Sequence, residues 1–187
     1  MRAYLAELAA LASGAGETIG PALAKAAALV TDAALAGRTT LVFGNGGSAT
    51  QAQHFAAELV VRFKDDRRAL PGLALSADVS VLTASANDYG YETVFARQVE
   101  ALGRPGDVAV GLSTSGRSPN VLAALSAARK RGLATILMTG ETGRAEAERW
   151  DVGLVVPSAE TAHVQEIHLA ALHLICRHVE DALKREE

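Results

Sequence analysis

Five short apolar runs recur along the chain, separated by longer segments in which polar and apolar residues mix. The runs lie at 39–44, 72–76, 107–113, 134–140 and 152–158. Each is apolar at consecutive positions, which is typical of strands buried on both faces of a sheet. The other segments predict helices at 48–64, 91–102, 118–131, 143–149 and 161–185. Since right-handed crossovers between parallel strands place helices on both faces, the pattern predicts a doubly wound α/β fold with a five-stranded parallel sheet.

The N-terminal segment is different, because residues 3–36 are rich in Ala and Leu and have helical character throughout. The Gly-Ala-Gly stretch at 14–16 is expected to divide it into two helices, with Pro21 in the first turn of the second. These helices are apolar over much of their circumference, so they need partner helices, which we expect from another subunit. The chain is thus expected to be a single domain, in which oligomerisation helices at 1–36 precede an α/β core at 37–187.

Composition and charge exclude several classes of protein. The net charge is −3 and no stripe of Lys and Arg is present, so a nucleic-acid partner is not expected. The single cysteine, Cys176, lies in an apolar run and excludes an internal disulfide framework and a Cys-rich zinc module. No stretch approaches the roughly 20 uninterrupted apolar residues of a membrane span, and no signal peptide is recognisable. A cytoplasmic protein without a membrane partner is expected.

The stretch LVFGNGGSAT at 41–50 raises the question of a nucleotide, because Gly44, Gly46 and Ala49 fit the loose dinucleotide-binding pattern. That pattern requires an acidic residue about 20 residues further on to hold the ribose. The candidate, Asp78, stands roughly a dozen residues too far along, and no Gly-Lys-Ser/Thr follows the glycines. No nucleotide cofactor is therefore expected.

A phosphate group fits the strand ends better than a nucleotide does. GNGGSA follows the first strand and STSGRSPN, at 113–120, follows the third, with a helix after each. Backbone N–H groups at a helix N-terminus together with hydroxyls bind anions without lysine. Four hydroxyls surround Gly116, which lets the backbone approach closely: Ser113, Thr114, Ser115 and Ser118. The competing interpretation of each loop is an ordinary helix cap rich in Ser and Gly.

Two predicted helices carry polar residues that share a face. His54 and Glu58 are four residues apart, and Gln165 and His173 are eight apart, about 80° around the helix axis. All four can border one cleft, where a Glu and a His could shuttle protons through an enediolate. The His and Glu pair could instead bind a metal. Each residue alone also fits a solvated or locally satisfied side chain. His163, His168 and His178 are expected beside the site, at a subunit interface and at the surface, respectively.

Five motifs occur together in order: FGNGGSA, HFAAEL, AND at 86–88, GLSTSGRSPNVLAAL and QEIHLAALH. Over about residues 5–183 the chain resembles the phosphoheptose isomerases (sedoheptulose-7-phosphate isomerases) of the sugar-isomerase (SIS) class, whose core is flavodoxin-like. The resemblance implies isomerisation of sedoheptulose 7-phosphate to D-glycero-D-manno-heptose 7-phosphate. It also implies a homotetramer with packed N-terminal helices and active sites between subunits.

The resemblance also implies roles for individual residues. Glu58 would be the base and His173 the acid/base that serves the oxygens. The phosphate would be held by Ser113, Thr114, Ser115 and Ser118. The sugar or its phosphate end would contact Asn45, Gly46, Gly47, Ser48, Asn87 and Asp88, with Glu58 and Gln165 also bordering the substrate. Zinc, as in several members, would be bound by His54, Glu58, Gln165 and His173. A glutamate that binds zinc is a poorer free base, so these two roles of Glu58 compete.

Two positions depart from the family pattern, since Arg117 replaces a common Asn and His163 replaces a frequent Arg. Alternatives to the enzyme are a non-catalytic SIS protein that binds a phosphosugar or associates with a replication initiator, and an isomerase of another sugar phosphate. The presence of both Glu58 and His173 favours the enzyme.

Overall fold

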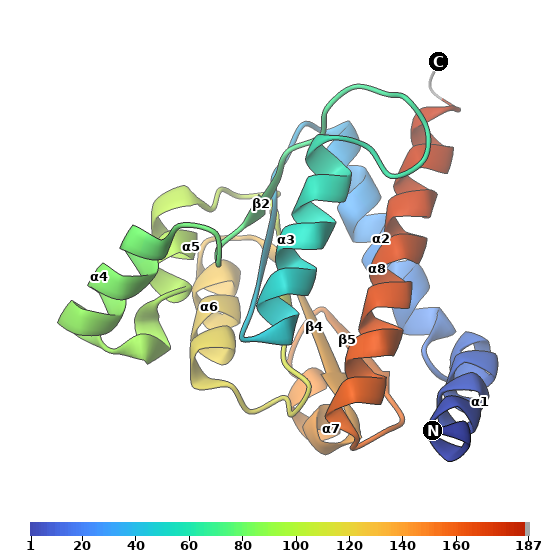
Figure 1. Ribbon diagram of the computed structural model, residues 1–187. Helices are drawn as coiled ribbons and strands as arrows, with labels where there is room; N and C mark the ends of the chain where they lie inside the picture. Colours follow the sequence, from blue (N-terminus) through green and yellow to red (C-terminus); the bar gives the residue numbers. More distant parts are fainter. Residues whose placement is uncertain (186–187) are drawn as a thin grey trace.

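The computed structural model describes residues 1–185, and its centre is a parallel sheet of five strands (Figure 1). The strands are β1 (Thr40–Gly44), β2 (Gly72–Ala74), β3 (Val108–Leu112), β4 (Ala134–Gly140) and β5 (Val152–Val156), in the order β2-β1-β3-β4-β5. This confirms the doubly wound fold. From β1 the chain passes to β2 on one side and then crosses to β3 on the other. The carboxyl ends of β1 and β3 therefore form the switch point at which ligands bind in such sheets.

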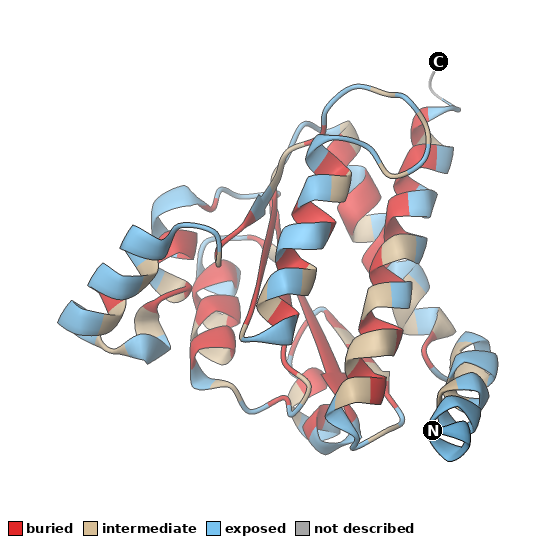
Figure 2. Cartoon of the chain, viewed as in Figure 1, coloured by how far each residue is buried: buried red, intermediate tan, exposed pale blue. Residues whose placement is uncertain are grey.

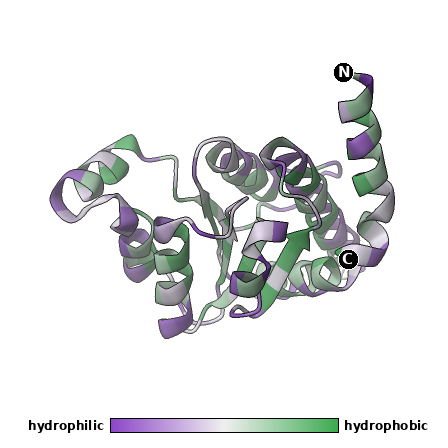
Figure 3. Cartoon of the chain, turned by 90° about the horizontal axis from the view of Figure 1, so that it is seen from below, coloured by the Kyte–Doolittle hydropathy of each residue, from purple (hydrophilic) through white to green (hydrophobic). Residues whose placement is uncertain are grey.

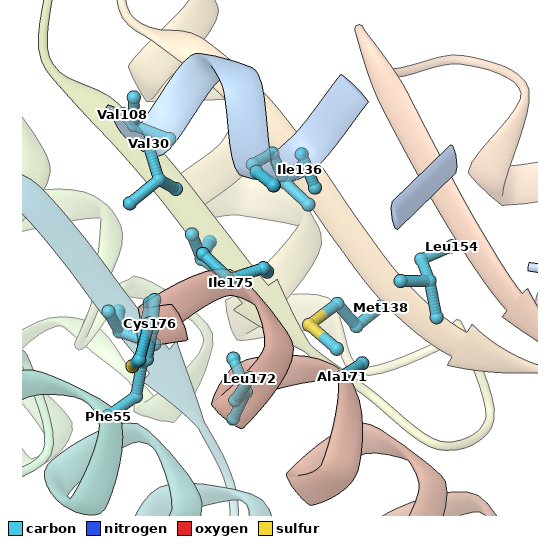
Figure 4. Close-up of a cluster of buried hydrophobic side chains, with 14 of the residues drawn as sticks. Val30, Phe55, Val108, Ile136, Met138, Leu154, Ala171, Leu172, Ile175 and Cys176 are labelled. Atoms are coloured by element: carbon cyan, nitrogen blue, oxygen red, sulfur yellow. The ribbon is translucent and has the colours of Figure 1, made fainter. Parts of the chain in front are cut away.

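Helices cover both faces of the sheet because alternate strand residues point to opposite sides. The first face is covered by α2 (Gly20–Leu35), α3 (Gly47–Val60) and α8 (Thr161–Leu183). The second face is covered by α5 (Ala96–Leu102), α6 (Pro119–Lys130) and α7 (Arg144–Ala147). In β1, Val42 belongs to the first apolar cluster and Phe43 to the second. Figure 4 shows part of the first cluster, where Leu172 and Ile175 of α8 face strand residues such as Met138.

Helix α4 (Val79–Tyr89) is absent from the sequence prediction. Most of this helix is exposed (Figure 2): Val79 is 70% exposed, Ser85 is the one buried residue, and Leu82 and Ala86 pack only partly against the core. Asp78 caps its N-terminus by accepting a hydrogen bond from Val81 N–H at 3.0 Å. The helix predicted at 91–102 is also divided, into a 3₁₀ turn at Tyr91–Thr93 and α5, and a second 3₁₀ turn at Glu141–Gly143 precedes the four-residue α7.

The break between the N-terminal helices lies at Ile19, so the prediction of a break at 14–16 is wrong. Gly14 and Gly16 lie inside α1 (Arg2–Thr18), because a glycine weakens a helix by only about 1 kcal/mol without ending it. Pro21 decides the position of the break, since it has no N–H to donate to the carbonyl of Glu17. Within residues 1–185 no single helix is long and apolar enough to cross a membrane; α1 and α2 together, bent by 70°, pass by length and composition only.

The two N-terminal helices have different surroundings. Six residues of α2 are buried, and α2 packs against α8 of its own chain, where Val30 lies near Ile175 (Figure 4). Helix α1 has no buried residue and stands at the side of the molecule, with Leu5 58% exposed (Figures 1 and 3). Its side-chain hydrogen bond to the core runs from Tyr4 Oη to Glu166 Oε1 at 2.7 Å. The expectation that partner helices cover this segment therefore concerns α1 in particular.

His168 lies in the core of its own chain rather than at an exposed interface, because it is 0% exposed, whereas His178 is at the surface as expected. Burial lowers the pKa of His168 to about 4. The unfolded chain therefore takes up a proton below pH 6.5 that the native state does not take up until about pH 4. The free energy of unfolding should fall by about 3 kcal/mol from this group between these two pH values.

A comparison of variants isolates this effect from that of the carboxylates. Urea unfolding at pH 7 and pH 4.5 should show a smaller loss of stability in His168→Leu than in the wild type. His178→Leu, which changes an exposed imidazole, should keep the full loss. An equal loss in His168→Leu and the wild type would show that His168 is not held neutral by burial.

Candidate active site

The loops that follow β1 and β3 meet at one edge of the sheet, because Gly44 pairs with Leu112 in the parallel register. In the first loop Gly46 adopts φ +55°, which favours glycine, and precedes the first turn of α3. Ser48 is buried at 3% exposure in that turn. Three of the predicted sugar contacts thus sit at the N-terminus of a 14-residue helix, where the N–H groups of Ser48 and Ala49 donate to the carbonyls of Asn45 and Gly46, each at 3.0 Å.

Asn45 is held by two residues that the sequence did not single out. Its amide exchanges two hydrogen bonds with the amide of Asn120, at 2.9 and 2.8 Å, and its Oδ1 also accepts from Tyr91 Oη at 3.0 Å. Asn120 is 2% exposed. A cavity of about 250 Å³ is lined by Asn45, Ser118, Asn120, Tyr91, Glu92 and Pro119. This cavity joins the loop after β1 to the loop after β3.

In the second loop the serine hydroxyls bond within the loop itself rather than to the first turn of α6. Ser118 precedes α6, yet its hydroxyl makes no capping hydrogen bond; Ser118 Oγ lies 2.9 Å from Ser113 Oγ. Ser115 Oγ accepts from the N–H of Arg117 at 3.2 Å. Gly116 has φ +66°, and a Cβ there would overlap the Cα of Gly143. The alternative of a simple Ser cap is therefore wrong for Ser118, whose oxygen is turned toward the other hydroxyl instead.

Helices α3 and α8 lie side by side and bring the predicted proton carriers together (Figure 1). His54 Nε2 lies 2.8 Å from His173 Nε2 and 3.3 Å from Glu58 Oε1. Since one imidazole nitrogen must donate and the other accept, the contact between the two rings couples their tautomers. Glu58 has 19% of its side chain exposed and His54 has 44%, so the group is open to a ligand on one side.

Gln165 lies against the first loop rather than in hydrogen-bond contact with the histidines. A Cβ on Gly47 would come within 2.8 Å of Gln165 Nε2, so a larger residue at this position would displace the end of the Gln165 side chain. The backbone carbonyl of Gln165 accepts from Gln51 Nε2 at 2.7 Å. This hydrogen bond holds the N-terminal part of α8 against α3. The predicted residues on α3 and α8 therefore line one surface, and Gln165 lies at the end of it that is closest to the loop after β1.

The donor chemistry of this group suits zinc, which binds imidazole nitrogen and carboxylate oxygen. Among residues 1–185, however, no three His, Cys, Asp or Glu side chains are arranged as a ligand set. The two imidazole nitrogens are at hydrogen-bonding distance, 2.8 Å, whereas two nitrogens on a tetrahedral zinc lie about 3.3 Å apart. If the distance between the two nitrogens increased by about 0.5 Å, both could bind the same zinc ion.

Asn87 and Asp88 lie at the end of α4, where Asn87 Nδ2 donates to Asp88 Oδ1 at 2.8 Å. Asp88 lines a groove of about 630 Å³ between β2, α4 and α5, together with Asp78, Tyr89 and Arg97. Within the described part of the chain, no hydrogen bond joins either residue to the other predicted site residues. His163, the second departure from the family pattern, is 2% exposed and packs on Tyr4, with ring centroids 4.3 Å apart.

A parallel sheet with glycine- and serine-rich loops at its switch point, and a carboxylate with paired imidazoles on two of its helices, is the architecture of a sugar-isomerase (SIS) domain. The SIS domain model matches residues 3–140. A phosphoheptose isomerase from Roseiflexus sp. is 51% identical over 170 residues, which cover 91% of this chain and 86% of that protein. The chain therefore belongs to the phosphoheptose isomerase family, whose members are aldose–ketose isomerases.

Solved structures agree with this assignment. Phosphoheptose isomerase GmhA from Neisseria gonorrhoeae superimposes with a TM-score of 0.90 at 40% identity, and 96% of each chain is covered. A phosphoheptose isomerase from Francisella tularensis gives a TM-score of 0.91 at 34% identity, again with 96% of each chain covered. The resemblance inferred from the five motifs is thus confirmed.

Proposed function

We propose that the protein interconverts sedoheptulose 7-phosphate and D-glycero-D-manno-heptose 7-phosphate through an enediolate. The observation that carries this proposal is the convergence of Glu58, His54 and His173 from two helices, beside an anion loop on the same sheet. The hydroxyls of Ser113, Thr114, Ser115 and Ser118 and the N-terminus of α6 would hold the phosphate. The sugar would lie along Asn45, Gly46, Gly47, Ser48 and Gln165, with Asn87 and Asp88 contributing from α4.

Glu58 would remove a proton from C1 of the ketose, next to the carbonyl carbon, which leaves an enediolate across C1 and C2. Return of that proton to C2 completes the aldose. His173 would donate a proton to O2 and accept one from O1, so that no proton is gained or lost overall. His54, 2.8 Å from His173, would set which ring nitrogen carries the proton. This arrangement provides separate proton carriers for carbon and for oxygen.

We also propose that zinc binds between α3 and α8 through His54, Glu58, Gln165 and His173. When bound, the ion would polarise the carbonyl and stabilise negative charge on the oxygens. The donor types of three of these residues converge in the structure, which supports the proposal. One lone pair cannot bind zinc and accept a proton at the same time. Glu58 would therefore have to bind the ion through one carboxylate oxygen and accept the proton on the other, or dissociate from the ion before accepting the proton.

The same proposal includes a homotetramer in the cytoplasm. Helix α1 supports self-association, because it buries no residue within its own chain and exposes apolar side chains such as Leu5. Packing of α1 against other copies would cover this surface. A cytoplasmic location follows from the substrate proposed, since sugar phosphates are made and consumed inside cells.

A comparison of ketose phosphates with five, six and seven carbons tests the proposed substrate. The phosphate loop recognises the phosphate alone, so all three should bind, but kcat/KM should be at least about tenfold higher for sedoheptulose 7-phosphate because the longer chain makes more hydrogen bonds. Aldose formation is measured with and without added zinc. No aldose from sedoheptulose 7-phosphate under either condition would refute the proposed reaction.

A further inference from the structure

Glu180 is a buried carboxylate that the proposed reaction does not use. It lies on α8 and is 3% exposed. A buried charge is costly unless it is paired and hydrogen-bonded. Glu180 Oε1 accepts from the N–H of Phe63 at 2.9 Å, and Glu180 Oε2 accepts from the N–H groups of Lys64 and Asp65 at 3.1 and 3.2 Å. Three consecutive backbone donors of the loop at 61–71 are thus satisfied by one side chain from another helix.

The charge partner of Glu180 is Arg67, whose side chain is 5% exposed and whose Nε lies 3.5 Å from Glu180 Oε1. The far end of the guanidinium reaches the last turn of α3. Arg67 Nη2 donates to the carbonyl of Glu58 at 2.6 Å, and Nη1 donates to that of Leu59 at 2.9 Å. Both carbonyls are in the last turn of the helix, where intrahelical partners are lacking, and that of Leu59 also accepts from the N–H of Leu70 at 3.1 Å. Arg67 therefore anchors the backbone of the proposed base.

Phe63, whose N–H donates to Glu180, contacts His173, the second proposed proton carrier. Its ring stacks on His173, with centroids 5.4 Å apart and planes inclined by 29°. Glu180 and His173 are seven residues apart on α8, about two turns, so both face α3 and its following loop. One carboxylate thus fixes the residue that covers the His173 imidazole and the arginine that anchors Glu58.

We propose that Glu180 is a positioning residue that aligns Glu58 and His173, acting through Arg67 and Phe63. This inference rests on the proposed roles of Glu58 and His173. Glu180 does not contact the substrate. It determines how far the loop and the end of α3 stand from α8, and hence where the two proton carriers lie relative to the reacting carbons.

The first test is the kinetics of Glu180→Gln, which keeps the shape but replaces one acceptor oxygen with a donor NH₂ group. We expect kcat to fall about tenfold, because a displacement of a fraction of an ångström at the reacting atoms costs part of the ~10²-fold lost for 1 Å. KM should change by less than about twofold, since the phosphate loop lies on β3 and α6. Asp181→Asn, an exposed carboxylate on the same helix, is the matched control and should leave both constants unchanged. An unchanged kcat in Glu180→Gln would overturn the proposal.

A pair of substitutions at Phe63 tests the connection even if Glu180→Gln fails to fold. Phe63→Tyr keeps the ring face and should retain kcat, whereas Phe63→Leu keeps apolar volume without a ring and should lose several-fold. Equal kcat in the two variants would contradict the role of stacking. In the double variant Glu180→Gln/Phe63→Leu, the loss should be smaller than the product of the single losses. Independent, multiplicative losses would show that Glu180 does not act through Phe63.

Two measurements do not depend on turnover and so separate this inference from the proposed function. In Glu180→Gln, amide hydrogen exchange should accelerate in the peptide that contains residues 61–68 but not in the strands. Carbethoxylation of His173 by diethyl pyrocarbonate, followed by peptide mass spectrometry, should be faster than in the wild type. If both are unchanged, the positioning role is wrong, whatever the substrate of the enzyme proves to be.

Discussion

Replacing Glu58 by Gln is expected to lower kcat by about 10³-fold while KM changes little, because the amide cannot accept the proton from carbon. The amide side chain has nearly the same size as the carboxylate. The backbone carbonyl of residue 58 keeps the hydrogen bond from Arg67 Nη2. The kcat of the purified variant with sedoheptulose 7-phosphate is the measurement. Glu100→Gln, the same chemical change at an exposed position on α5, is the matched control and should retain wild-type kcat.

The zinc content of Glu58→Gln separates the two roles proposed for this residue. A variant that keeps about one zinc per subunit but loses turnover would identify Glu58 as the base rather than as an essential ligand. Loss of zinc together with turnover, restored by excess zinc, would assign it to the metal. Wild-type kcat in Glu58→Gln would refute the role of Glu58 as the base.

Gly116→Ala is expected to destabilise the fold by about 2–5 kcal/mol and to weaken phosphate binding. Gly116 has φ +66°, where an L side chain costs roughly 1–2 kcal/mol, and the new methyl group would overlap the Cα of Gly143 and lie 3.0 Å from Thr139 Oγ1. Such overpacking costs a further ~1–3 kcal/mol. Thermal unfolding should show Tm lowered by about 5–15 °C.

Gly37→Ala is the matched control for this prediction. Gly37 has the same φ, +66°, but nothing lies within 4 Å of its Cβ position. This control should therefore show the backbone cost alone, about 1–2 kcal/mol, and an unchanged KM. If Gly116→Ala is no less stable than Gly37→Ala, the contact between the phosphate loop and the turn at Gly143 does not constrain the loop.

The motifs of the predicted site could be recognised in the sequence because each depends on residue types and spacings within one short segment. Ser113, Ser115 and Ser118 stand around a glycine at the end of a buried strand, and no partner elsewhere in the chain is needed to propose a phosphate loop there. His54 and Glu58 share a face by helical spacing alone. In contrast, the sequence contains no local signal for Asn120 or Tyr91, whose roles come from hydrogen bonds to a loop 75 and 46 residues away.

Glu180 illustrates the same limit more strongly. At the end of a long helix with charged neighbours it resembles a solvated residue, and its burial follows from a loop more than 100 residues earlier in the chain. Helix α4 is absent from the sequence prediction for a related reason, because most of it is exposed and Ser85 is its one buried residue. The 2.8 Å contact of His54 with His173 also depends on how α3 and α8 pack, which spacing within each helix does not determine.

The sequence by itself therefore determined the parallel sheet, the glycine- and serine-rich loops at its strand ends and the family, because these follow from short-range apolar patterns and motifs. The tertiary structure alone decided that α2 is part of the core while α1 has no fully buried residue, that His168 lies in the interior, and that Glu180 joins the two helices of the site. The physical reason is that burial and side-chain pairing depend on which segments meet in space. The spacing of residues along the chain does not reveal such contacts, because they form only when the sheet brings distant segments together.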